Sequence, residues 1–96
     1  MLRFALDLFL EKLQERYPKW DFIPVVARKY VWVWKKEKAR PENETLYCLI
    51  SVSRGDIYRA AGDSIKAKEP SGDIWHVINE EDWSFCKEEG ISYEHT

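Results

Sequence analysis

The fold is decided by residues 28–37, RKYVWVWKKE, where aromatic and β-branched side chains alternate from Tyr30 to Trp34. This alternation predicts a β-strand, because successive side chains of a strand point to opposite faces of a sheet. One face would carry Tyr30, Trp32 and Trp34, and the other would carry Val31 and Val33. A strand with two apolar faces needs neighbouring strands and a covering layer, which the flanking sequence must supply.

The sequence after this strand predicts a hairpin. Residues 45–52 form its first arm, residues 53–55 (Ser-Arg-Gly) its turn and residues 56–59 its second arm, because Gly55 can adopt a positive φ without steric cost. In the first arm we expect one face to hold every second side chain, namely Leu46, Cys48, Ile50 and Val52.

The sequence before this strand predicts an edge strand and a helix that covers the sheet. Residues 21–27 are β-rich but contain Pro24, which suits an edge strand or a bulge. Residues 2–17 predict an amphipathic helix that ends at Pro18. Its apolar residues recur at helical spacing: Leu2, Leu6, Phe9, Leu13 and Tyr17.

The C-terminal third is less regular. Residues 60–72 are polar and predict a long ordered loop over the sheet, and residues 74–78 predict a last strand. Asn79 is expected to cap a short helix that runs to Glu89 and is closed by Gly90. The predicted fold class is therefore α+β: an N-terminal amphipathic helix packed on a small antiparallel sheet of about four strands, with a short C-terminal helix.

Composition limits the classes of protein to which the chain can belong. Its 96 residues predict one domain, 1–96, and its 45% hydrophobic and 33% charged residues are typical of a soluble globular protein. The net charge of −2 argues against a polybasic nucleic-acid coat, although residues 1–48 hold ten basic and seven acidic residues and residues 49–96 hold five and ten. Asp7 interrupts the N-terminal apolar run, so we expect no signal peptide, no membrane partner and a cytoplasmic location.

No set of residues carries a catalytic or metal-binding motif. Cys48 and Cys86 lack metal-ligand spacing, and a disulfide between them would require an oxidising compartment. Two sets could be written down as catalytic groups, but neither has a motif around it: Cys48 with His76 and Asp73, and Asp56 with Asp63. We therefore expect a protein that is not an enzyme and uses no metal or cofactor.

Two parts of the chain are candidates for binding. Tyr30, Trp32 and Trp34 lie among Lys35, Lys36 and Lys38, a combination that holds single-stranded nucleic acid in many proteins. The same aromatic side chains could instead pack in the core or on the sheet surface. Glu80, Glu81 and Asp82 begin an acidic C-terminal part that could face a basic surface, or could serve helix capping and solubility.

Residues 45–62, TLYCLISVSRGDIYRAAG, resemble a segment of small uncharacterised proteins of tailed bacteriophages. In those proteins a strand leads to a Thr-Gly-Asp turn, an Ile-Tyr-Lys step, an Ala-Gly or Ala-Ser pair and a lysine-containing loop. The resemblance covers roughly residues 28–75 and includes Lys29-Tyr30, and the loop lysines survive as Lys66 and Lys68. The chain departs from the pattern at Asp63, where the family usually has Trp, and at residues 71–75.

The resemblance implies a context rather than a chemistry. Small accessory phage proteins are commonly non-catalytic binders that inhibit or redirect a host protein, such as a defence or nucleic-acid-processing complex. On that basis we expect a host protein as partner and place its site at Lys66, Lys68, Glu80, Glu81, Asp82 and Trp83. Single-stranded nucleic acid is the alternative partner, and an exposed edge strand near Pro24 would favour a homodimer.

Overall fold

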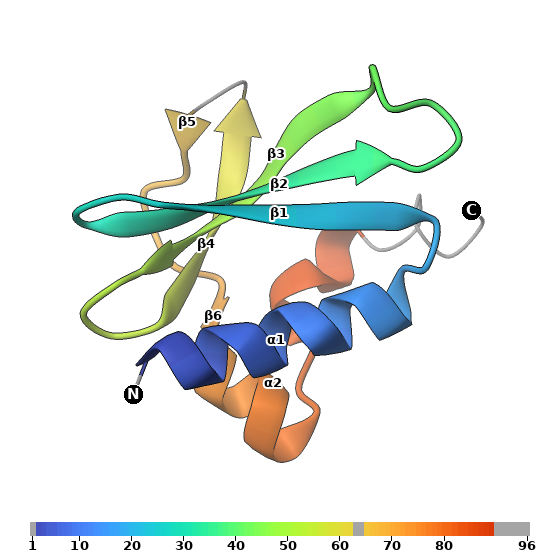
Figure 1. Ribbon diagram of the computed structural model, residues 1–96. Helices are drawn as coiled ribbons and strands as arrows, with labels where there is room; N and C mark the ends of the chain where they lie inside the picture. The colour runs from blue at the N-terminus through green and yellow to red at the C-terminus, as the bar shows by residue number, and fades with distance from the viewer. Residues whose placement is uncertain (1, 63–64, 90–96) are drawn as a thin grey trace.

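The strands form one antiparallel sheet, and both α-helices lie on the same side of it (Figure 1). The computed structural model describes residues 2–62 and 65–89. The elements in chain order are α1 (Leu2–Arg16), β1 (Trp20–Val26), β2 (Tyr30–Glu37), β3 (Glu44–Ser51), β4 (Asp56–Gly62), β5 (Ile65–Lys66), β6 (Gly72–Asp73), α2 (Ile74–Glu80) and the 3-10 helix η1 (Ser84–Glu89). The sheet order is β1-β2-β3-β4-β5, with β6 beside β4. The α+β class is confirmed, and the sheet has more strands than the four or so expected.

The predicted hairpin and edge strand are both present in the sheet. Both β1 and β3 pair antiparallel with β2, and β3 pairs with β4 as a hairpin. Gly55 closes the turn of that hairpin with φ of 79°, and its N–H donates to the Ser51 carbonyl at 2.8 Å. Pro24 lies in β1, the edge strand, as its residue type predicts.

The core lies between the sheet and the helices. Leu6, Phe9 and Leu13 of α1 cover the inner face of the sheet and are at most 6% exposed. Their buried partners come from every layer of the fold: Val31, Val33, Tyr47, Cys48, Ile50, Ile57, Ile74, Val77, Phe85 and Cys86. Fully burying a side chain of the size of Leu or Phe contributes about 1.5–3 kcal/mol, so this contact anchors the helix to the sheet.

The expected alternation in β3 is wrong at Leu46. Val33 of β2 pairs with Cys48, whereas the next residue, Trp34, pairs with Leu46, so the register shifts by one and leaves Tyr47 between the two pairs. This β-bulge puts both Tyr47 and Cys48 in the helix-side core. Leu46 instead shares the face of its partner Trp34, because residues opposite each other in a sheet point the same way.

The long loop expected over the sheet at residues 60–72 is in part an extension of the sheet. The strand β4 continues to Gly62, and the short strands β5 and β6 both pair with it. Ser71 completes the connection by donating its N–H to the Ile57 carbonyl at 2.7 Å. Local composition misses these short strands because alanine, glycine and lysine have low β propensity and pair here through the backbone.

The strand expected at residues 74–78 and the helix start expected at Asn79 are both wrong. These residues form α2, whose N-cap is Asp73, with the side chain accepting from the His76 N–H at 2.9 Å. Ile74 and Val77 are buried at helical spacing, and a five-residue apolar run fits either element. The helix ends at Glu80, Glu81 follows in the left-handed region, and η1 is a separate element. The predicted closing residue, Gly90, lies outside the described residues.

The structure also bears on membrane-spanning helices and on the two cysteines. None of the described helices is long and apolar enough to cross a membrane. Both cysteines are buried as thiols, with Cys48 only 1% exposed, so the thiol of Cys48 packs in the core as a small group.

Candidate functional site

The aromatic side chains of β2 lie on the face of the sheet that the helices leave uncovered, which we call the outer face. Val31 and Val33 point into the core, so the alternating residues Tyr30, Trp32 and Trp34 point away from it. All three are partly exposed, whereas the two valines are buried. The prediction that these rings could pack in the core is therefore wrong, whereas packing on the sheet surface and binding of nucleic acid both remain.

Neighbouring strands build an apolar surface around these rings. Across the sheet, Trp32 lies between Val25 and Leu49, and Trp34 lies between Ile23 and Leu46. Leu49 is 1% exposed and Leu46 7%, although both lie on the helix-free face. Packing on the sheet surface and exposure thus coexist, because the aromatic rings bury their leucine neighbours while keeping part of their own surface open.

Tyr58 and Lys66 complete this surface. The ring of Tyr58, from β4, meets that of Tyr30 edge to face across β3, with 5.8 Å between the centroids. The ammonium group of Lys66 lies over both rings, 4.1 Å from the centroid of Tyr58 and 5.6 Å from that of Tyr30. We call Tyr30, Trp32, Trp34 and Tyr58 the aromatic row. Tyr58 is not among the binding residues predicted from the sequence, although alternation in β4 and its pairing with Leu49 place it on this face.

The three lysines predicted to bind nucleic acid together with these rings lie in different places. Lys36 is on the outer face, because it follows Trp34 by two positions and pairs with Asp21 and Glu44. Lys35 lies on the other face, with its ammonium group 4.5 Å from the ring centroid of Trp20. Lys38 lies beyond the end of β2, with 3.8 Å between its Nζ and Oδ1 of Asp21.

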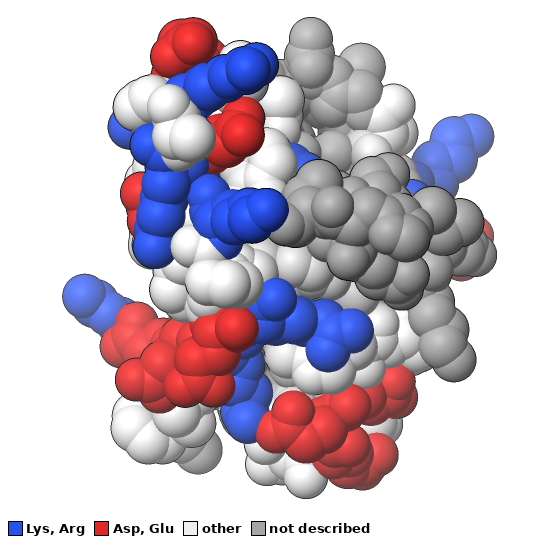
Figure 2. Space-filling view, turned by 90° about the vertical axis from the view of Figure 1, so that its right-hand side faces the viewer, with Lys and Arg blue, Asp and Glu red and all other residues white. Residues whose placement is uncertain are grey.

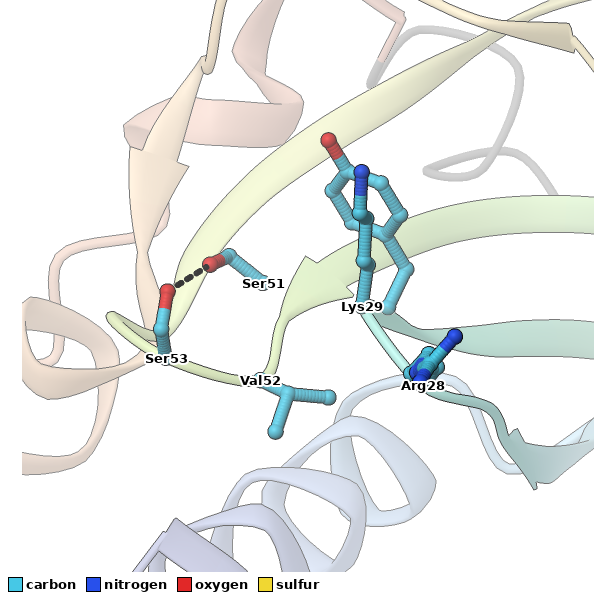
Figure 3. A pocket seen from close by; sticks show the side chains of 6 residues that line it. Arg28, Lys29, Ser51, Val52 and Ser53 are labelled. Carbon is cyan, nitrogen blue, oxygen red and sulfur yellow. Dashed lines mark hydrogen bonds between the residues drawn. The ribbon is translucent and has the colours of Figure 1, made fainter.

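A hollow of about 330 Å³ adjoins the row at Tyr30, between the β1–β2 turn and the β3–β4 turn (Figure 3). Its lining residues are Arg28, Lys29, Tyr30, Ser51, Val52 and Ser53. In Figure 3, Lys29 and Ser53 point away from α1, and a dashed line joins the hydroxyls of Ser51 and Ser53, which are 3.2 Å apart. The two turns are tied by the Val52 N–H, which donates to the Lys29 carbonyl at 2.9 Å.

The residues predicted to bind a host protein do not form one surface. Lys66 lies on the outer face, and Lys68 is exposed in the segment after β5. Glu81 is on the helix side, where it forms an ion pair with Lys12 of α1. This hydrogen bond to Lys12 lowers the pKa of Glu81, and the same contact raises the pKa of Lys12. Glu80 lies beside it as the last residue of α2 and is exposed.

Asp82 and Trp83 have structural contacts as well. The Asp82 carboxylate accepts from the Ser84 N–H at 3.0 Å, at the start of η1. The half-buried Trp83 ring stacks on Phe9 with 6.5 Å between centroids, and the Arg16 guanidinium lies 4.6 Å from its centroid. Capping, as considered for the acidic residues, therefore accounts for Asp82, and packing accounts for much of Trp83.

The residues considered as possible catalytic groups lie in different parts of the fold. Cys48 is inside the core, whereas His76 and Asp73 pair at the start of α2 with 2.7 Å between Nδ1 and Oδ2, and the His76 side chain is 54% exposed. Asp56 pairs with Arg54 at 3.4 Å, and Asp63 lies outside the described residues. Within residues 2–62 and 65–89, no group of three or more His, Cys, Asp or Glu could hold a metal ion.

Positive and negative side chains are unevenly distributed on the side of the molecule shown in Figure 2. In Figure 2, most Lys and Arg side chains lie in the upper part of the view, at the level of the sheet in Figure 1. Most Asp and Glu side chains lie lower, at the level of the helices. On this side of the molecule, a negatively charged partner would therefore be favoured near the sheet over the helices.

Compared with protein-family models, curated proteins and solved structures, the chain gives no match. The resemblance to small phage proteins thus stays a prediction from the hairpin motif. What the chain can bind has to be argued from its own surface.

Proposed function

We propose that this protein acts by binding rather than by catalysis, and that the outer face of its sheet binds single-stranded nucleic acid. The observation that carries the proposal is the aromatic row: partly exposed rings on a helix-free sheet face, with a lysine ammonium group over two of them. Aromatic platforms flanked by cations bind single strands without requiring a particular sequence, because every base has a π-face.

The spacing of the rings suits an extended strand. Side chains two positions apart on a β-strand are separated by about 6.7 Å. That is about twice the 3.4 Å rise between stacked bases of one strand. A single strand drawn out to this spacing would place one base at each of Tyr30, Trp32 and Trp34.

Cations at both ends of the row would meet the phosphates. Lys66 lies over the rings of Tyr30 and Tyr58, and Lys36 lies two positions beyond Trp34. Asp21 and Glu44 are opposite Lys36, so we expect the end with Lys66 to attract phosphate more strongly.

Removal of one ring tests the proposal. Trp32→Ala should weaken binding of an unstructured oligonucleotide at low salt by about 1–3 kcal/mol, since each stacked base contributes that much. Affinity would be measured by fluorescence anisotropy of a labelled strand. Phe4→Ala is the matched control, because Phe4 is also an exposed aromatic residue but lies on α1. Circular dichroism would confirm that both variants fold.

Two results would count against the proposal. A flat titration of the wild-type chain at low salt would exclude nucleic acid as the partner. Equal losses of affinity in Trp32→Ala and Phe4→Ala would mean that binding does not use the outer face.

The second candidate is the accessory role implied by the phage resemblance, in which the protein binds and inhibits a host protein. It is favoured by the apolar neighbours of the row: Ile23 is partly exposed, and Val25 is 49% exposed beside Trp32. Trp and Tyr are enriched among residues that dominate protein interfaces. Pull-down from host lysate with and without nuclease separates the candidates, since a protein retained after nuclease treatment favours this one.

The cytoplasm is the location that we propose for either function. The two cysteines are buried as thiols, which is compatible with a reducing compartment, where disulfides are rare. Cell fractionation with an antibody to the chain would test the location, and recovery in a membrane or secreted fraction would contradict it.

A further inference from the structure

The hollow between the two turns has the chemistry of an anion site. It lies at the Tyr30 end of the aromatic row and is lined by two cationic side chains, Arg28 and Lys29, and by the hydroxyls of Ser51 and Ser53. Ser51 is only 8% exposed, and its hydroxyl also accepts from the Arg54 N–H at 3.3 Å. Ser51 can therefore hold the exposed Ser53 hydroxyl in place by donating to it, which leaves the proton of Ser53 and the two exposed cations for an anion.

The walls of the hollow are held in position by the backbone. The Val52 N–H donates to the Lys29 carbonyl, so the β1–β2 and β3–β4 turns cannot separate without losing this bond. Tyr30 and Ser51 are partners in the β2–β3 register, which fixes the floor between the turns. Asp56, which follows the β3–β4 turn, is engaged by Arg54 with 3.4 Å between Oδ2 and Nε, which reduces its repulsion of an anion.

We infer that this hollow binds a phosphate group, with Arg28 and Lys29 neutralising its charge and the Ser53 hydroxyl donating to one of its oxygens. The inference rests on the proposed function for the source of the phosphate, which is the backbone of the nucleic acid strand. A phosphate seated here would lie beside Tyr30 and place the adjoining base at the first ring of the row. The hollow would therefore fix the register of the strand along β2.

The salt dependence of oligonucleotide binding tests this inference. The double variant Arg28→Ala/Lys29→Ala should make the slope of log K against log[salt] less steep by about 1 for each charge removed. Arg3→Ala/Lys19→Ala is the matched control, because it removes the same charge from exposed positions that do not line the hollow. Trp32→Ala, in contrast, should weaken binding and leave the slope unchanged.

Binding of pyrophosphate, which carries no nucleobase, provides a second measurement. Pyrophosphate would be titrated into the wild-type chain at constant ionic strength while the backbone amide resonances are followed by NMR. We expect saturable shifts at residues 51–54, and we expect Arg28→Ala/Lys29→Ala to abolish them. Sodium chloride added to the same ionic strength should produce no such shifts.

The two measurements separate failure of the hollow from failure of the outer face. If oligonucleotide binds and the double variant behaves as its control, the phosphate site is refuted and the proposed function stands. If no oligonucleotide binds but pyrophosphate shifts residues 51–54, the phosphate site stands with another source of phosphate and the proposed function fails. If neither ligand binds, both are wrong.

Discussion

Gly55 is the residue at which the β3–β4 turn depends most directly on a missing side chain. Its φ of 79° lies in the left-handed region that β-carbon atoms disfavour. A Cβ at this position would also lie 2.8 Å from Nε1 of Trp75 and 3.1 Å from Cγ1 of Ile74. The turn and the start of α2 are therefore in contact at a point where only glycine fits.

Gly55→Ala should lower the free energy of unfolding by about 1–3 kcal/mol, the usual cost of holding a non-glycine residue in a sparsely populated region. The crowding at Trp75 adds to this cost. Urea denaturation would measure it. Arg54→Ala is the control, because it removes only an exposed ion pair with Asp56 that contributes about 0–1 kcal/mol. Equal stabilities of the two variants would show that the turn tolerates a β-carbon.

The pair formed by Asp73 and His76 makes the stability of the start of α2 depend on pH. The hydrogen bond and charge of Asp73 raise the pKa of His76 above its usual 6.5. The stabilising contribution of the charged pair is therefore fully present below about pH 6.5, the value for an unfolded chain. It is lost as the pH rises through the higher pKa of the folded state.

Asp73→Asn separates this effect from helix capping, because an amide oxygen can still accept from the His76 N–H. The wild-type chain should be more stable than the variant at pH 5.5, and this difference should shrink by pH 8.5. Urea denaturation at both pH values measures the difference, and NMR titration should find a lower pKa for His76 in the variant. A stability difference independent of pH would contradict the prediction.

Among the elements, β1 shows how a free edge is protected. The Ala27 N–H donates to the Tyr30 carbonyl, and the Lys38 N–H donates to the Lys19 carbonyl, so the odd-numbered residues of β1 face β2. The backbone of Pro24 therefore faces the open edge, where its missing N–H costs no bond within the sheet. It also deprives an incoming strand of a donor at the middle of the edge.

Pro24→Thr should restore that donor and promote self-association through β1. Sedimentation velocity over a range of concentrations would detect it as a dimer that the wild-type chain forms less readily. Val26→Thr is the control, because it changes a side chain of the same edge and leaves the backbone donors unaltered. A wild-type dimer that Pro24→Thr does not strengthen would mean that any homodimer uses a different surface.

The elements also differ in how well local sequence predicts them. α1 and β2 have long, regular patterns with one outcome, and their predicted bounds are correct to within two residues. The α2 run from Ile74 to Ile78 fits a strand or a helix equally well. The contact of Ile74 and Val77 with the core and the cap from Asp73 favour the helix.

At the scale of the whole molecule, the fold separates two tasks. The helix side holds the core and the ion pair between Lys12 and Glu81, which joins α1 to the end of α2. The outer face carries the aromatic row and leaves it open. An antiparallel sheet can have one face in the core and the other toward solvent, so a chain this short can expose aromatic side chains and keep a core.

Periodicity and the conformational limits of glycine and proline are enough to predict the α+β class, the amphipathic helix, the β3–β4 hairpin and the two faces of β2. Only the tertiary structure decided that the helices cover the valine face. It alone also decided that Lys35 lies apart from the aromatic row and that Tyr58 and Lys66 join it. These outcomes follow from register, a bulge and packing between distant segments, which no local pattern encodes.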